Sequence, residues 1–270
     1  MRRTYFDVQL DEIRKEMAPH SPEKKRKHPV RHTALLGFVL AGVTAITCFM
    51  AVVMPRQISQ QADTVYTPLL QTANVGDVVC LGTYEQDNDL ADGTEQIEWI
   101  VLCKQDEQAL LVSKYALDYA PFNTGSAIST WDYSTLLQWL NESFFTTAFT
   151  PAEQSLVCLS RIEADQNAFF HSDPGKITRS RVFLLSLAEA KNYLRTTDDR
   201  QCAPTAYAEA QGANPEGSSC GWWLRSPGYD ESAASLVAAD GSFSFIGQPA
   251  ERSLAVRPAI WVECGADDAV

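Results

Sequence analysis

One uninterrupted apolar segment, residues 34–54, constrains this chain more than any other feature of its sequence. Its sequence is ALLGFVLAGVTAITCFMAVVM, and it contains no charged side chain. A helix of about 20 apolar residues crosses the roughly 30 Å hydrocarbon core of a bilayer. The segment therefore predicts a single transmembrane helix that divides the chain between two compartments.

The charges on either side of this segment predict its orientation. Residues 1–33 carry a net charge of +4, whereas the remainder of the chain carries −16. Because basic flanks stay on the cytoplasmic side of a membrane, we expect a cytoplasmic tail over 1–33 and an extracellular C-terminal part at the cell surface. The alternative is a cleaved signal peptide, but such a peptide has a shorter start and a shorter apolar run.

The acidic charge beyond the apolar segment limits the partners of this part of the chain. Nucleic-acid binding requires clustered Lys and Arg, so we expect no nucleic-acid partner, and membrane lipid would be contacted through 34–54. Histidine is also scarce, because only His171 lies outside the tail. Catalytic triads and most catalytic zinc sites use histidine, so hydrolases of those kinds are disfavoured, and we expect no cofactor.

The part beyond the apolar segment is predicted to form one domain behind a short linker. Residues 55–74 are polar and aperiodic, as in a stalk. Residues 75–264 are long enough for one domain with a sizeable core, and 265–270 form an acidic end.

The order of the predicted elements indicates an α+β domain. Alternation and turn signals predict a three-stranded meander over 76–84, 97–104 and 109–116. Apolar spacing and capping boxes predict helices over 130–141, from 151 onward and over 187–194, with a short buried strand at 182–186 between them. The last predicted strands cover 222–226, 233–239, 242–246 and 254–262.

Several of these segments resemble one bacterial family, domain of unknown function 6273. They are GDVVCLGTYEQDNDLADGTEQIEWIVL, WDYSTLLQWLNESFFTTAF, VFLLSLAEAKNYL, and WWLRSPG with VRPAIWV, which occur in this order within 75–264. The terminal pattern, WWLRS followed by a small-residue strand, a Gly turn and VRPA, also resembles C-type-lectin-like folds, including formylglycine-generating enzymes. The predicted elements together give a mixed domain of antiparallel strands with two or three helices, and the lectin-like resemblance implies a fold used mostly as a binding scaffold.

The WWLRS segment contains the first candidate ligand site. In a strand, Trp223 and Arg225 share one face and Trp222 lies on the other. We expect one tryptophan in the core and the other as a platform for a sugar ring or a cation, with Arg225 and Arg257 supplying hydrogen-bond donors. The alternative is that both arginines pair with acidic residues and stiffen the terminal sheet.

The acidic tip between the first two predicted strands extends from Glu85 to Glu95 and suggests a calcium site, with Asp87, Asp89 and Asp92 as the candidate ligands. The segment does not fit an EF-hand, because Ala91 occupies the fifth position and the required glycine is displaced to Gly93. The alternative is a solvated hairpin tip without a metal.

Six cysteines follow the apolar segment, an even count that allows disulfides in an oxidising compartment. Cys202 and Cys220 bracket a loop that contains proline and glycine, and they are the first candidate pair. The alternative is that they are buried free thiols.

These features favour a membrane-anchored extracellular module that binds a glycan or a protein and has no catalytic activity. A second hypothesis is a metal-dependent oxidase of the formylglycine-generating type, which would bind copper through Cys220 and Cys264. A third is a transmembrane receptor, in which the tail 1–33 would signal through a cytoplasmic partner.

Overall fold

The structure, a computed structural model, describes residues 70–125 and 129–264. These residues lie in one of the two units into which the chain divides, Phe49–Val270. The expected tail, transmembrane helix and acidic end, and most of the expected stalk, lie outside the described residues. Within the described part, no helix has both the length and the apolar character that a membrane crossing requires.

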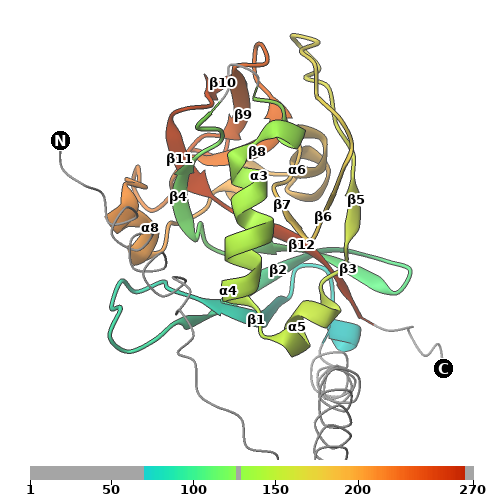
Figure 1. Ribbon diagram of the computed structural model, residues 1–270, viewed down its shortest axis with the longest axis vertical. Coiled ribbons are helices and arrows are strands. Elements are labelled where there is room, and N and C mark those ends of the chain that lie inside the picture. The colour runs from blue at the N-terminus through green and yellow to red at the C-terminus, as the bar shows by residue number, and fades with distance from the viewer. Residues whose placement is uncertain (1–69, 126–128, 265–270) are drawn as a thin grey trace, which may run out of the picture. The chain divides into compact units, whose positions relative to one another are not determined.

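The first sheet begins with the predicted meander. Strands β1 (Val78–Tyr84), β2 (Glu95–Gln105) and β3 (Gln108–Ser113) pair antiparallel in sequence order. The late strand β12 (Ala259–Glu263) then pairs antiparallel with β3, and β7 (Val182–Phe183) pairs with β12. The sheet order is therefore β1-β2-β3-β12-β7. The late strand β12 lies in the same sheet as the three early strands (Figure 1).

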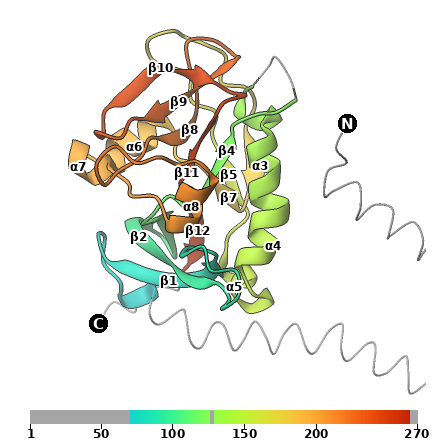
Figure 2. The same cartoon turned by 90° about the vertical axis from the view of Figure 1, so that its left-hand side faces the viewer.

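The second sheet is built mostly from the C-terminal strands, in the order β10-β9-β8-β11-β4. Its members are β4 (Asp118–Pro121), β8 (Trp222–Pro227), β9 (Ala233–Val237), β10 (Phe243–Pro249) and β11 (Ser253–Val256). All neighbours are antiparallel except β8 and β11, which run parallel. Figure 2 shows β8, β9 and β10 at one end of this unit and β1 and β2 at the other. A small hairpin of β5 (Ser160–Ile162) and β6 (Thr178–Ser180) completes the described strands.

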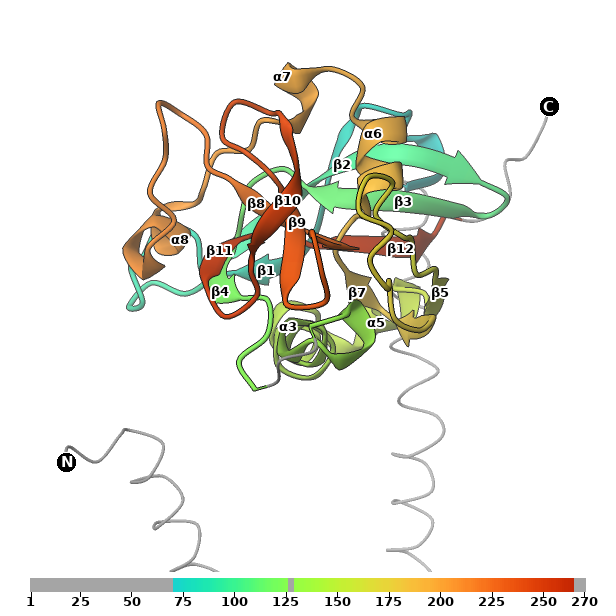
Figure 3. The same cartoon turned by 90° about the horizontal axis from the view of Figure 1, so that it is seen from above.

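The segment predicted as one strand over 254–262 is divided between the two sheets. β11 ends at Val256 in the second sheet, and β12 begins at Ala259 in the first. Pro258 lies at the division. Proline has no backbone N–H to donate to a neighbouring strand, but its carbonyl accepts a hydrogen bond from the Ser113 N–H at 2.9 Å. Figure 3 shows β12 beside β3, away from β11.

The helices begin where the capping signals predict them. Helix α5 (Pro151–Leu156) starts with a capping box between Thr150 and Glu153, and α6 (Leu187–Tyr193) starts with one between Ser186 and Glu189. The helix predicted over 130–141 is longer, because α3 (Thr135–Trp139), a π-helical turn, η2 (Leu140–Phe144), and α4 (Phe145–Ala148) follow without a break. A short 3₁₀ turn, η1 (Trp131–Tyr133), precedes them.

Two short helices were not predicted, α7 (Thr197–Arg200) and α8 (Ala206–Gln211). The described residues thus form a mixed α+β unit, and its helices α3 to α8 exceed the two or three expected. Both sheets share one continuous core, whose largest fully buried side chains include Trp99, Trp222, Trp223 and Phe149.

Candidate functional site

The tryptophans of β8 do not form the expected platform. Trp222 and Trp223 both have an exposed fraction of 0%. The Trp222 indole donates to the Arg200 carbonyl and the Trp223 indole to the Ala120 carbonyl, each at 2.9 Å. The prediction of an exposed ring on this strand is wrong, because β8 is the central strand of its sheet and is covered on both faces.

Arg225 also points into the protein, with an exposed fraction of 4%. Its guanidinium binds both carboxylate oxygens of Glu189, and Nη1 also donates to the Leu184 carbonyl at 2.9 Å. A second carboxylate, that of Asp165, lies 3.7 Å from Nη2. This arrangement matches the structural alternative, in which the arginine pairs with acidic residues and offers no donor to a ligand.

Arg257 is buried without an acidic partner among the described residues. Its Nε donates to the Ser113 carbonyl at 3.0 Å, and its guanidinium lies over the Trp222 ring at 4.9 Å. The Nη1 atom has no hydrogen-bond partner in the described part of the chain. With 1% of its surface exposed, Arg257 holds the junction of β11 and β12 against β3 and β8 and does not reach solvent.

The candidate disulfide residues lie side by side as free thiols. Cys202 and Cys220 are both buried, and the Cys220 N–H donates to the Cys202 carbonyl at 2.8 Å. Burial raises the pKa of the Cys220 thiol to about 12, so it is protonated at neutral pH. A disulfide between them remains a prediction.

The cysteines of the oxidase hypothesis belong to different parts of the fold. Cys220 neighbours Cys202 at the start of β8. Cys264 follows β12, where its N–H donates to the Glu107 carbonyl and its thiol neighbours that of Cys158. The structure therefore does not bring the proposed copper ligands together.

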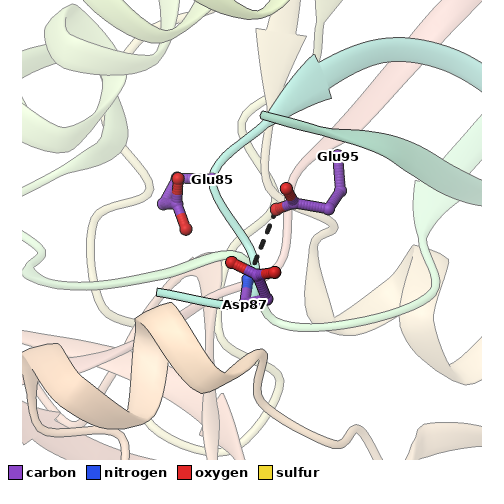
Figure 4. Close-up of side chains that lie close together, drawn as sticks. All are labelled: Glu85, Asp87 and Glu95. Atoms are coloured by element: carbon purple, nitrogen blue, oxygen red, sulfur yellow. Dashed lines mark hydrogen bonds between the residues drawn. The ribbon is translucent and has the colours of Figure 1, made fainter. Parts of the chain in front are cut away.

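The acidic tip is arranged differently from the expected calcium ligands. Asp89 and Asp92 are exposed on the loop between β1 and β2, where Asp89 accepts from the Ala91 N–H at 3.1 Å. Asp87 instead lies with Glu85 and Glu95, and one oxygen from each lies within 4.8 Å of the others (Figure 4). The sequence contained all three carboxylates, but their grouping depends on the pairing of β1 with β2.

The structure contains a pocket of about 370 Å³ on the second sheet. One wall is the loop 212–221, and the others come from the turn 238–240 and from side chains of the sheet, Tyr119, Leu236, Gln248 and Leu254. Pockets of several hundred Å³ with an apolar floor and a few polar groups are typical ligand sites. A hollow of similar volume near the β2–β3 turn is lined by polar side chains such as Gln105, Asp106 and Arg161, and also by Cys158, Leu159 and Trp261.

The end of α8 positions the loop wall of this pocket. Thr205 caps the start of α8, and Gly212 ends the helix with a positive φ of 124°. A Cβ atom at Gly212 would lie 2.8 Å from the Tyr119 ring, so glycine permits both the left-handed turn and the close approach to β4. Beyond it, the Glu216 N–H donates to the Ser219 carbonyl at 2.8 Å and turns the loop back toward β8.

The polar lining of the pocket is acidic or neutral. Glu216 and Asp240 contribute carboxylates, Asn214 and Gln248 contribute amides, and none of the described lining residues is Lys or Arg. Hydrogen bonds from the Ser242 hydroxyl and N–H hold the pKa of Asp240 below its usual range, which keeps it charged. The pocket therefore suits neutral or cationic ligands with hydroxyl or amino groups and disfavours anions.

Comparison with known proteins places the chain in a family whose function is not defined. No curated protein and no solved structure matches it. One family model matches residues 106–264, which covers β3 to β12 and every lining residue of the pocket. The chain thus belongs to the family described as Domain of unknown function (DUF6273).

Proposed function

We propose that the chain is a membrane-anchored extracellular binding module without catalytic activity, and that the pocket beside the loop 212–221 is its ligand site. The observation that carries the proposal is the lining of this pocket, which combines the Tyr119 side chain, an apolar floor from the sheet and four polar side chains. An aromatic side chain next to amides and carboxylates suits a sugar ring, whose apolar face and hydroxyl edge need both kinds of contact. A basic peptide would also complement the Glu216 and Asp240 carboxylates.

The location of the module is part of the same proposal. The uncharged segment 34–54 and the +4 charge of residues 1–33 support a single-pass anchor with a cytoplasmic N-terminus. Protease treatment of intact cells tests this orientation. Epitopes in 70–264 should be cleaved and an N-terminal epitope protected, and the reverse pattern would contradict the proposal.

The lectin-like architecture remains a proposal as well. Its support is the order of the C-terminal elements, in which the loop 212–221 precedes β8 and the chain closes through β11 and β12. Scaffolds that place a long irregular loop against a rigid sheet are well suited to binding, because loop residues can vary while the sheet keeps its geometry.

The binding function is tested with the full chain in detergent micelles, screened against glycans and basic peptides. The exposed side chains Asn214 and Glu216 are replaced by alanine, and Glu107→Gln serves as a control because it is exposed and lies outside the pocket. We expect each pocket variant to weaken binding by roughly tenfold, equivalent to the loss of one good polar contact, and the control to leave it unchanged. Binding that is equal in all variants would reject this pocket as the ligand site.

A further inference from the structure

The loop between β1 and β2 gathers three carboxylates in a place separate from the pocket. Glu85 follows the last residue of β1, Asp87 lies two residues further, and Glu95 begins β2. One oxygen from each residue lies within 4.8 Å of the other two (Figure 4). These three residues are called the acidic triad below.

Strand pairing and loop amides hold the acidic triad together. Tyr84 is paired with Glu95 in the β1–β2 ladder, which sets Glu95 opposite the start of the loop. Its Oε2 atom then accepts from the N–H groups of Gln86 at 2.6 Å and Asp87 at 3.3 Å. Asp87 Oδ1 accepts from the Asp89 N–H at 2.8 Å. Backbone donors thus orient one oxygen of Glu95 and one of Asp87.

Glu85 is the unusual member of the acidic triad. Its exposed fraction is 8%, and its Oε1 atom is buried with no hydrogen-bond partner in the described part of the chain. Burying a carboxylate oxygen without a partner is unfavourable, and two further carboxylates beside it increase the penalty. The Asn88 backbone N–H hydrogen-bonds to the Glu85 carboxylate, so only the Oε1 atom of Glu85 is without a donor among the described residues. The buried Oε1 atom therefore lacks a compensating partner among the described residues.

No basic side chain in the described part of the chain forms an ion pair with the acidic triad. The nearby α8 contributes Tyr207, whose N–H donates to the Gln86 carbonyl at 2.9 Å and which carries no positive charge. A cation from solution would be the missing partner.

We propose that Glu85, Asp87 and Glu95 bind one Ca²⁺ ion. Ca²⁺ binds carboxylate oxygens at about 2.4 Å, so a single ion can bridge oxygens that lie up to about 4.8 Å apart. It accepts six to eight oxygens in flexible geometry, and water would complete the shell at this partly exposed loop. Mg²⁺ fits less well, because it requires a strict octahedron and usually takes only one or two carboxylates. The ligand set differs from the three aspartates that the sequence suggested, and the site does not depend on the proposed function of the pocket.

Calorimetry and thermal unfolding of the full chain in detergent micelles test the proposal. After treatment with a chelator, the protein is titrated with Ca²⁺ and, separately, with Mg²⁺. We expect one Ca²⁺ per chain with a dissociation constant of roughly 10⁻⁵ to 10⁻³ M, a rise in the melting temperature, and at least tenfold weaker binding of Mg²⁺. Absence of binding at about 10 mM Ca²⁺, or equal binding of Mg²⁺, would overturn the assignment.

Two variants separate a specific site from general attraction to an acidic loop. Glu85→Gln should weaken Ca²⁺ binding by at least about tenfold, whereas Asp92→Asn, which removes one negative charge from the same loop outside the triad, should not. Without Ca²⁺, Glu85→Gln should melt at a higher temperature than the wild-type chain, because it removes an unpaired buried charge. That result would also show that the variant folds. Equal weakening by both variants, or none by Glu85→Gln, would reject the triad as the site.

Discussion

Among single residues, Glu189 links the start of a helix to the centre of the second sheet. Its carboxylate accepts from the Ser186 N–H at 2.9 Å and so completes the capping box of α6. The same carboxylate binds the buried guanidinium of Arg225 on β8. A motif that is visible locally in the sequence therefore also forms a long-range contact.

Replacing Arg225 by alanine should lower the free energy of unfolding by about 3 kcal/mol, because the partly buried Glu189 would lose its counter-charge. Urea unfolding followed by tryptophan fluorescence measures this, since all six tryptophans lie in the described part of the chain. Arg161→Ala is the control, because its ion pair with Glu163 is exposed and should contribute less than about 1 kcal/mol. Similar losses in the two variants would contradict the prediction.

At the scale of elements, Asn167 joins an irregular segment to two strands of the second sheet. The residue is fully buried, and its amide donates to the carbonyls of Pro227, Gly228 and Phe245 at 2.8 to 3.2 Å. Its Oδ1 accepts from the N–H of Phe169 at 3.0 Å. One side chain thus satisfies the backbone at the end of β8, on β10 and in the loop before β6.

Asn167→Ala should destabilise the protein by roughly 2–3 kcal/mol, because it leaves several buried backbone groups without partners. The exposed Asn214→Ala is a matched control that should change the free energy of unfolding by less than about 0.5 kcal/mol. Urea unfolding of both variants gives the comparison. A loss confined to Asn214→Ala, or no loss in either, would show that the amide network contributes little.

At the scale of the whole described unit, the two sheets are covalently joined and share one core. β11 and β12 are separated by only Arg257 and Pro258, yet they belong to different sheets. The earlier strands β3 and β4 likewise enter different sheets. Because the chain passes from one sheet to the other at both places, we expect the two sheets to unfold together in one cooperative transition.

Stability of this unit should fall as the pH rises from about 9 toward 12. Burial raises the pKa of Tyr84, and it raises the pKa values of Tyr193, Cys158 and Cys220 to about 12. In the unfolded chain these groups ionise at their ordinary, lower values, so the unfolded state binds fewer protons and the slope of stability with pH is negative.

The urea midpoint under reducing conditions should therefore be lower at pH 10.5 than at pH 8. Each tyrosine or cysteine that stays protonated in the folded chain but ionises in the unfolded chain adds to this decrease. Tyr193→Phe removes one of these groups and should make the decline less steep. A midpoint that stayed constant or rose with pH would contradict the pKa directions.

Local sequence signals predicted much of the secondary structure. The capping boxes at Thr150 and Ser186, the meander of β1 to β3 and the C-terminal strands depend on contacts within a few residues or between adjacent strands, so they are visible without tertiary information. The strand over 254–262 was only partly right, because a pattern of apolar residues does not show that its two halves enter different sheets.

The sequence by itself determined the mixed class of the domain, the acidic charge and the family, whereas only the tertiary structure decided which side chains are available for function. Trp223 is buried on the central strand β8, where its indole donates to the carbonyl of Ala120, 103 positions away, and Arg257 donates to the carbonyl of Ser113, 144 positions away. The pocket likewise depends on chain segments that meet only on folding, because its lining runs from Tyr119 to Leu254. Alternation along a strand shows which side chains share a face, but burial of that face depends on what packs against it.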